Sequence, residues 1–227
     1  MGPSISSTCK GRVAEDKMVV MGKLSSEDTS WVEAELPDWG RAIYTVDDIN
    51  ATLHTPMNRG NEGMAYLTYV IEHYDCLPEL VLFLHAHRDE YWHADPPGWD
   101  TPRIVGNLKL DYVRKLGYTN LRCNSNPGCT EPVRPLVSYT EGERDSERHN
   151  ILVGEAWQFM FQELPPTEVS SACCSQFAVT RDNILRRSLD DYRRYRQWLI
   201  DTPASSFWSG RVMEFTWHVI FGAEYTK

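Results

Sequence analysis

The stretch Leu80-Val-Leu-Phe-Leu84 is the clearest buried strand in the chain, and it runs directly into His85-Ala-His87-Arg88. Five consecutive apolar residues are typical of a strand covered on both faces, as in the sheets of α/β proteins. Polar side chains that follow such a strand lie at its carboxyl end, where open α/β sheets bind ligands. This stretch therefore predicts both the fold class and the place of a site.

Apolar runs and helical periodicities alternate along the rest of the chain. Strands are predicted at 18–21, 41–46, 80–84, 118–123 and 170–179, and helices at 26–36, 63–77, 101–116, 148–164, 181–200 and 209–221. Strands separated by helices of about a dozen residues need crossover connections, which favour a parallel sheet. The predicted fold is a three-layer α/β sandwich with a mostly parallel central sheet.

Length and composition are those of one ordinary domain. The 227 residues are 41% hydrophobic and 24% charged, which is enough apolar surface for a real core, and no internal repeat is visible. We expect residues 1–17 to be a flexible N-terminal arm and residues 18–227 a single α/β domain. No apolar run reaches the length of a membrane span and residues 1–10 lack a secretory signal, so no membrane partner and a cytoplasmic location are expected.

The net charge and the cysteine spacing disfavour several classes of protein. A net charge of −9 argues against sequence-blind nucleic-acid binding and against a DNA partner, because both depend on a basic surface. The six cysteines show no Cys-x-x-Cys spacing, so a zinc ribbon or disulfide framework is disfavoured and mostly free thiols are expected.

Two histidines follow the strand at 80–84. His85 and His87 occupy alternate positions, so both project to one face, and with His93 and Asp95 they could bind a metal ion. The alternative is that both imidazoles bond backbone groups at the strand end. Because the further ligands would come from a loop, the sequence favours the second interpretation, and no metal is predicted.

Two other segments could bind charged groups. Asp47 and Asp48 follow the strand at 41–46 and could hold a cation or a guanidinium, although two acidic residues there also suit a turn. Asn58-Arg-Gly-Asn-Glu62 places a glycine and free N–H groups before a helix, which suits an anion, and Arg59 adds charge.

The last helix carries three polar residues on one face, Arg211, Glu214 and His218. Glu214 and His218, four residues apart, could share a proton, or they could be an ordinary surface pair. Cys173-Cys174-Ser175-Gln176 offers nucleophiles, or simply the small residues that a central strand needs.

Arginine is concentrated between residues 181 and 196. The arginines of this segment are Arg181, Arg186, Arg187, Arg193, Arg194 and Arg196. With Tyr192 and Tyr195 between them they could grip an RNA backbone and stack on bases, while a solvated charged face is the simpler interpretation.

Seven segments in this order resemble one mostly fungal domain family, long catalogued without a function, in which some members are arginine-containing cyclodipeptide synthases. They are Asn58-Arg-Gly-Asn-Glu62, Tyr66-Leu-Thr-Tyr-Val-Ile71, Leu77-Pro78, Phe83-Leu-His-Ala-His-Arg88, Asn120-Leu-Arg-Cys123, Cys174-Ser-Gln-Phe-Ala-Val179 and Ser209-Gly-Arg-Val-Met-Glu-Phe-Thr-Trp-His218. The resemblance spans about residues 28 to 222.

The resemblance implies that residues 18–227 are a catalytic domain with two aminoacyl-tRNA partners, arginyl-tRNA and a second one, joined into a cyclic dipeptide (a diketopiperazine) for secondary metabolism. It implies no cofactor, because the aminoacyl ester is already activated. The expected catalytic residues are Glu214, His218, His85 and His87. The expected substrate-binding residues are Asp47, Asp48, Arg59, Glu62, Gln176 and Arg211. The expected tRNA contacts are Arg186, Arg187, Arg193 and Arg194.

Two other function classes fit the same sequence. The order of acidic strand end, Asn-x-Gly-x-Glu helix start and His-x-His segment also resembles glycosyltransferases of the GT-A type, which implies a nucleotide-sugar and a divalent cation held by His85, His87 and Asp47. A non-catalytic protein that binds RNA or a small molecule would keep the basic segment and tolerate loss of Glu214.

Overall fold

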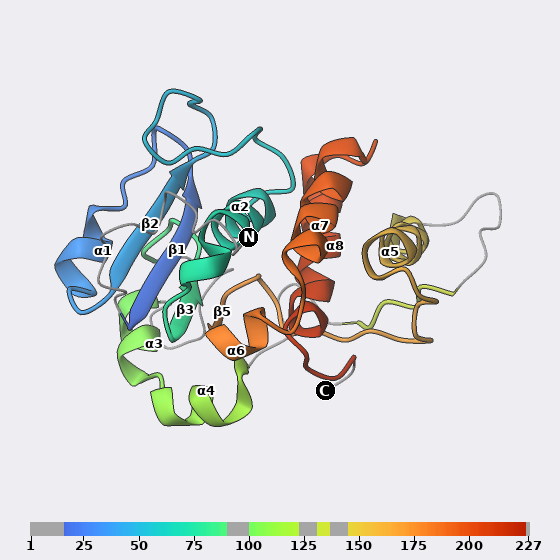
Figure 1. The fold of residues 1–227 in the computed structure, drawn as a ribbon. Coiled ribbons are helices and arrows are strands. Elements are labelled where there is room, and N and C mark those ends of the chain that lie inside the picture. The colour runs from blue at the N-terminus through green and yellow to red at the C-terminus, as the bar shows by residue number, and fades with distance from the viewer. Residues whose placement is uncertain (1–15, 90–99, 123–130, 137–144, 226–227) are drawn as a thin grey trace, which may run out of the picture.

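The computed structural model describes residues 16–89, 100–122, 131–136 and 145–225. These residues form one open sheet of five strands with helices on both faces (Figure 1). The strands are β1 (Lys17–Lys23), β2 (Gly40–Thr45), β3 (Leu80–Phe83), β4 (Tyr118–Asn120) and β5 (Phe177–Thr180). The helices are α1 (Ser30–Glu35), α2 (Gly63–His73), the 3-10 helix η2 (Tyr74–Cys76), α3 (Thr101–Asn107), α4 (Leu110–Leu116), α5 (Asp145–Phe161), α6 (Arg181–Ile184), α7 (Leu189–Asp201) and α8 (Ser206–Ile220).

The sheet is mixed, so the predicted mostly parallel sheet is not confirmed. Its strand order is β2-β1-β3-β5-β4, in which β1 pairs in parallel with β2 and β3, while β5 pairs antiparallel with β3 and β4. The prediction treated α5 as a crossover helix on the sheet. Instead α5 packs against α7 and α8, on the side of that pair away from the sheet (Figure 1). The chain therefore returns to pair β5 directly beside β4.

Successive residues of the central strands face two different apolar cores in turn, as the pleat of a strand requires. Val20, Val81 and Phe83 face the larger core, which also holds residues of α2, α5, α7 and α8. Val19 and Leu82 face the smaller core, which holds residues of α1, α3 and α4. Both faces of the sheet are covered, which gives the three layers predicted from the sequence.

Two of the predicted helices are each divided in two. The helix expected at 101–116 is interrupted at Leu108 and Lys109, which have extended backbone angles. The helix expected at 181–200 stops after α6, and Ser188 then begins α7 with a capping box that it forms with Asp191. Periodicity did not reveal these breaks because the apolar positions stay in phase across them.

Three segment boundaries also differ from the prediction. The strand at 170–179 is reduced to its last residues, because Cys174 and Ser175 have φ values of 84° and 48° and turn the chain before β5. The helix at 26–36 is reduced to α1, and Lys17 already belongs to β1. In the parts of the chain that the structure describes, no helix is long and apolar enough to cross a membrane.

Candidate active site

Polar residues from distant segments meet at one edge of the sheet. Phe83 at the end of β3 lies opposite Phe177 at the start of β5, and Asn120 at the end of β4 pairs with the same Phe177. His85, Arg122 and the 173–176 turn therefore lie at the edge where the parallel strands β1 and β3 end. This is the edge at which α/β sheets bind ligands.

Glu214 of α8 is the most tightly held carboxylate at this edge. Its Oε2 accepts a hydrogen bond of 2.5 Å from the Arg211 guanidinium, and its Oε1 accepts the backbone N–H of Cys174. The residue is 8% exposed. Because both oxygens are occupied by donors, Glu214 is a fixed negative charge that anchors the 173–176 turn to α8.

His85 and Gln176 close the other side of the turn. The His85 Nε2 lies 2.7 Å from the carbonyl oxygen of Cys174, so this nitrogen carries the proton. The Gln176 Oε1 accepts the backbone N–H of His85 at 3.0 Å. The buried Arg122 donates to the Cys174 Sγ at 3.2 Å. The turn is thus fixed from β3, β4 and α8 together.

Glu62, immediately before α2, faces this cluster with its carboxyl group. Desolvation raises the pKa of the Glu62 carboxyl, the charge of Glu214 raises it further, and His85 and the Ser175 hydroxyl act in the opposite direction. The residue as a whole is half-buried, although its carboxyl lies in dense surroundings. The two carboxyl groups of the site therefore differ: Glu214 is paired with a guanidinium, and Glu62 has a raised pKa.

The loop before α2 explains how Glu62 reaches this place. Gly60 and Asn61 both have positive φ, and a Cβ on Gly60 would lie 2.6 Å from the Leu199 Cδ2. Gly210 of α8 makes room for Asn61 in the same way, since a Cβ there would lie 2.5 Å from the Asn61 Nδ2. The Asn-x-Gly-x-Glu segment is thus a close-packing element that sets Glu62 beside α8.

Two buried polar atoms beside Glu62, the Tyr66 hydroxyl and the Trp217 Nε1, have no hydrogen-bond partner among the described residues. Tyr66 lies one helical turn after Glu62. Burial, and to a lesser extent the charge of Glu62, raise the Tyr66 pKa, and the Tyr66 and Trp217 rings are 5.7 Å apart. Since buried polar groups in native proteins are nearly always bonded, this concentration marks a place where a ligand's polar groups would complete the bonding.

His149 of α5 borders the same cluster. Burial and the neighbouring charge of Arg211 lower the pKa of His149 from 6.5 to about 4, so the imidazole is neutral at pH 7. Its ring packs against Trp208 and Phe215. The neutral imidazole and these rings thus form the apolar surroundings of Arg211, whose guanidinium lies over the Phe215 ring.

Four residues expected in the site have structural partners elsewhere. His87 pairs with Glu27 at 3.0 Å. Both carboxylate oxygens of Asp47 accept bonds from Ser25, and Asp48 accepts the N–H of Asn50, as in a turn. The Arg59 guanidinium donates to the carbonyls of Thr202 and Ala204, which ties its loop to the start of α8.

The expected proton sharing between Glu214 and His218 is replaced by another arrangement. Glu214 bonds Arg211 and the Cys174 N–H, whereas the His218 Nε2 faces the carbonyl of Tyr225 at 3.4 Å. The two side chains of α8 therefore bond different parts of the protein. Of the sequence-predicted residues, the structure brings together Glu62, His85, Gln176, Arg211 and Glu214.

The arginines of residues 181–196 bind within the protein. Arg186 donates to the carbonyl of Gly222, and Arg187 lies over the Phe161 ring. Arg193 pairs with Asp190 at 2.8 Å, and Arg194 pairs with Asp191 and also donates to the carbonyl of Met160. Of these four, Arg186 and Arg193 are exposed. Each of the four therefore has a partner within the protein, and their contact with tRNA stays a prediction.

The cysteines correct another expectation. Cys173 and Cys174 form a disulfide between neighbouring residues, and Cys76 is disulfide-bonded too, so these three are not free thiols. Cys173, Cys174 and Glu214 form the one group in the described ranges that has the spacing for a metal ion. A disulfide removes both thiolates as ligands, so this group does not suit a metal. His93 and Asp95 lie outside the described residues.

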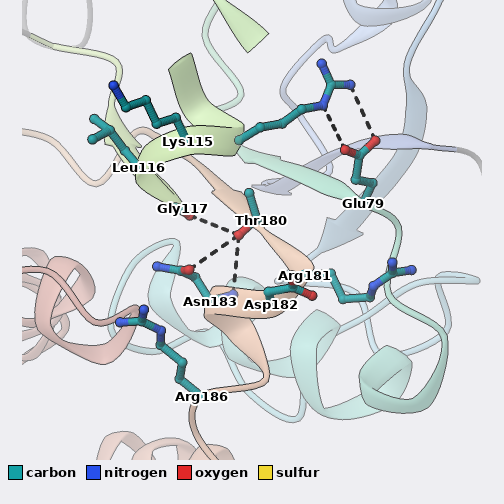
Figure 2. A pocket seen from close by; sticks show the side chains of 10 residues that line it. Glu79, Lys115, Leu116, Gly117, Thr180, Arg181, Asp182, Asn183 and Arg186 are labelled. Carbon is teal, nitrogen blue, oxygen red and sulfur yellow. Dashed lines mark hydrogen bonds and ion pairs between the residues drawn. The ribbon is translucent and has the colours of Figure 1, made fainter. Parts of the chain in front are cut away.

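A depression lies at the opposite edge of the sheet. It is a groove of about 420 Å³ between α4 and α6, and its cationic residues are Arg114, Lys115, Arg181 and Arg186 (Figure 2). Glu79 pairs with Arg114 at 2.7 Å, and Asn183 and the Gly117 carbonyl surround the Thr180 hydroxyl. Arg181 and Arg186 donate to the backbone carbonyls of Leu77 and Gly222.

The comparisons with known proteins give one match. The model of a family described as "Protein of unknown function (DUF3431)" matches residues 19–227. The chain belongs to this family. No curated protein and no solved structure matches it. The match covers every segment that contributes to the site.

Sequence reasoning missed several members of the site. Arg122 follows a predicted strand and carried the same positional signal as His85, but it was not singled out. Tyr66 and His149 read as ordinary apolar-face residues of helices, so no local pattern distinguishes them.

Proposed function

We propose that this protein is an aminoacyltransferase that condenses arginyl-tRNA with a second aminoacyl-tRNA into an arginine-containing cyclic dipeptide. The observation that carries the proposal is the buried Glu62 carboxyl, whose pKa is raised, beside the fixed Glu214–Arg211 pair. The motif resemblance supplies the substrate class, and the chemistry below explains how these residues would serve it.

Peptide-bond formation from an aminoacyl ester needs a base for the attacking amine. An α-ammonium has a pKa near 8, and its proton must leave before nitrogen can attack the ester carbonyl. A carboxylate with a raised pKa is a stronger base than an ordinary one. Glu62 is accordingly assigned to bind the α-ammonium and accept its proton.

The surroundings of Glu62 suit a cationic substrate. Among the described residues, the charges that act on its carboxyl are those of His85 and Glu214. The two arginines of the site have other partners, since Arg211 is bonded to Glu214 and Arg122 donates to the Cys174 Sγ. An entering ammonium would therefore meet a carboxylate that lacks a guanidinium or lysine partner, which favours binding electrostatically.

The ester carbonyl becomes an oxyanion during the attack and needs hydrogen-bond donors. The Tyr66 hydroxyl and the Trp217 N–H are buried donors without partners in the described structure. Such donors stabilise developing charge most effectively when they are fixed and dry. The reaction as proposed uses no ATP, since the ester is already activated, and an aminoacyl-tRNA substrate implies the cytoplasm.

The test is expression in a bacterial host, which supplies aminoacyl-tRNAs, followed by mass spectrometry of the medium. We expect an arginine-containing cyclic dipeptide from the wild type, and a decrease of at least about 100-fold in Glu62→Gln, because a general base contributes about 10²–10⁴-fold. Glu214→Gln should lose product as well, because the 173–176 turn loses its charged anchor.

Glu155→Gln is the matched control, since this exposed glutamate of α5 undergoes the same chemical change far from a buried carboxyl. It should produce as much as the wild type. A folded wild-type protein that yields no cyclic dipeptide, or a fully active Glu62→Gln variant, would overturn the proposal. In extracts, ribonuclease should abolish product formation, and a chelator should leave it intact.

A further inference from the structure

Four ring side chains form a row that runs from the surface of the protein to the candidate site. Phe207, near the start of α8, is 60% exposed, and the centre of its ring lies 5.0 Å from that of the half-buried Trp208. The Trp208 ring lies 5.6 Å from that of His149, and the His149 ring lies 5.4 Å from that of the buried Phe215. These four residues, the aromatic row, join an exposed aromatic surface to the interior of the site.

The inner end of the aromatic row meets the charged groups of the site. The Arg211 guanidinium lies 5.4 Å from the centre of the Phe215 ring, and it donates to the Glu214 Oε2 at 2.5 Å. Glu214 in turn acts on the Glu62 carboxyl through its charge. The side chain of Arg211 is 23% exposed, so solvent reaches this part of the row as well. A ligand that lies on the row therefore has one end beside the groups assigned to chemistry.

His149 adds a hydrogen-bonding nitrogen to the row. The residue is 7% exposed, and its Nε2 has no hydrogen-bond partner in the part of the chain that the structure describes. Because its pKa is lowered to about 4, the ring is neutral at pH 7, and Nε2 can donate or accept one hydrogen bond. Nearly all buried polar groups in native proteins are bonded, so this nitrogen points to a ligand independently of the exposed rings.

Exposed rings, a guanidinium and a hydrogen-bonding nitrogen are groups that bind a nucleotide. Every base has a flat face that stacks on aromatic side chains, and arginine both binds phosphate and stacks on bases. Stacking does not depend on a basic surface. It therefore suits a protein with a net charge of −9 whose expected tRNA contacts, Arg186, Arg187, Arg193 and Arg194, each have a partner within the protein.

The chemistry of an aminoacyl-tRNA determines where its last base must lie. The ester joins the amino acid to the ribose of the 3′-terminal adenosine, so the adenine is one sugar away from the carbonyl carbon that is attacked. With that carbon at Glu62, the adenine lies beside the site and stays connected to the tRNA outside. The aromatic row has this course, since it leads from Arg211 and Phe215 outwards to Phe207.

We infer that Phe207 and Trp208 are the binding platform for the 3′-terminal adenosine of the aminoacyl-tRNA, with its adenine stacked on their rings. This inference rests on the proposed function, which supplies the tRNA. Because every tRNA ends in the same adenosine, the platform binds arginyl-tRNA and the second aminoacyl-tRNA alike, and the amino acids are distinguished elsewhere in the site.

The experiment measures binding of two RNAs to the purified protein by fluorescence anisotropy at one salt concentration. They are uncharged arginine-accepting tRNA and the same tRNA without its terminal adenosine. We expect the wild type to bind the complete tRNA about 5- to 150-fold more tightly, which is the range for one base stacked on an aromatic ring. Phe207→Ala should lose most of this preference, and its affinity for the shortened tRNA should be unchanged. Phe207→Tyr, which keeps a ring, should retain the preference.

Phe159→Ala is the matched control. Phe159 lies on α5, is 45% exposed and is not a member of the aromatic row, so this variant should bind both RNAs as the wild type does. Because the Phe207 side chain is largely exposed, Phe207→Ala should fold normally, which circular dichroism checks. In a steady-state assay Phe207→Ala should raise the KM for arginyl-tRNA and leave kcat unchanged, as the loss of binding alone requires.

The two proposals fail in different ways. A wild type that does not prefer the complete tRNA, or a Phe207→Ala variant that keeps the full preference, overturns the platform. So does a Phe207→Ala variant that changes only which cyclic dipeptides are made, since the row would then hold an amino-acid side chain. Each of these results leaves the proposed function standing if wild-type cells make an arginine-containing cyclic dipeptide. Absence of that product overturns the proposed function, whereas a preference that Phe207→Ala removes still supports the platform.

Discussion

The two edges of the sheet differ in whether their polar side chains have partners within the protein. At the edge where β1 and β3 end, Glu62 has a raised pKa, and the Tyr66 hydroxyl and Trp217 Nε1 are buried without partners in the described chain. At the other edge, Arg114 is exposed and paired with Glu79, and the Asn183 Nδ2 binds the carbonyl of Phe221.

The two edges differ in how far their polar groups are already bonded within the protein. Unsatisfied polar groups and positive φ values cost free energy, so a fold retains them where binding requires them. In the groove of Figure 2, by contrast, Arg114 is ion-paired, Arg181, Arg186 and Asn183 donate to backbone carbonyls, and the Thr180 hydroxyl has partners. Substitutions at the groove should therefore alter the free energy of unfolding, and substitutions beside Glu62 should alter activity.

The largest stability effect is expected from Gly117→Ala at the groove. Gly117 ends α4 with φ 80°, and a Cβ there would lie 2.1 Å from the Asn183 Oδ1. Left-handed backbone and overpacking together should cost about 2–4 kcal/mol of unfolding free energy, measured by urea denaturation. The protein that remains folded should make cyclic dipeptide at the wild-type rate per molecule.

Gly106→Ala is the control for this substitution. A Cβ at Gly106 would meet nothing within 4 Å, and the residue lies in α3, where alanine is preferred to glycine. Its stability should be equal to or slightly above that of the wild type. If Gly117→Ala were equally harmless, the groove would not be the close-packed edge described above.

Much of the fold was predictable from the sequence. The apolar runs at β1, β2 and β3 gave three strands correctly, and Gly117 was recognised as a helix end. The direction of β5 was wrong, because it depends on where α5 packs, and neither periodicity nor propensity records that. Long-range packing, rather than local preference, set the part of the fold that sequence patterns missed.

The second prediction concerns acid stability on the Arg211 side of the site. The folded pKa of His149 is about 4 against 6.5 in the unfolded chain, so the unfolded state binds more protons between these values. Stability should therefore fall as the pH decreases from 6.5 to 4, by about 3 kcal/mol at most. His149→Phe should remove this part of the acid sensitivity, as urea titrations at pH 7 and pH 4.5 would reveal.

His87→Gln provides the comparison, because His87 is a more exposed histidine paired with Glu27. The same urea titrations of this variant show how much of any change comes from the loss of a histidine as such. An unchanged slope in His149→Phe would mean that His149 is charged in the folded protein, contrary to its packing between Trp208 and Phe215.

The candidate site was predictable in its positions but not in its pairings. His85, Glu62 and Glu214 were selected because each follows a strand, begins a helix or shares a helical face. Asp47 and Arg59 had the same kind of signal, yet their side chains bond Ser25 and the carbonyls of Thr202 and Ala204. A single sequence shows which residues are near a strand end, and only tertiary structure shows which of them are already bonded.

A substitution of Glu62 should change stability and activity in opposite directions. Because the folded pKa of Glu62 is raised above its unfolded value, the folded state holds more protons between the two values, and stability is lost as the pH rises through the folded pKa. Glu62→Gln cannot lose a proton, so its melting temperature should exceed that of the wild type at pH 8, and the difference should shrink towards pH 4. Glu155→Gln should show no such trend. A variant that is more stable yet inactive would show that Glu62 is retained for chemistry at a cost in stability, whereas a less stable Glu62→Gln at pH 8 would show that the ionised carboxylate is bonded in the fold.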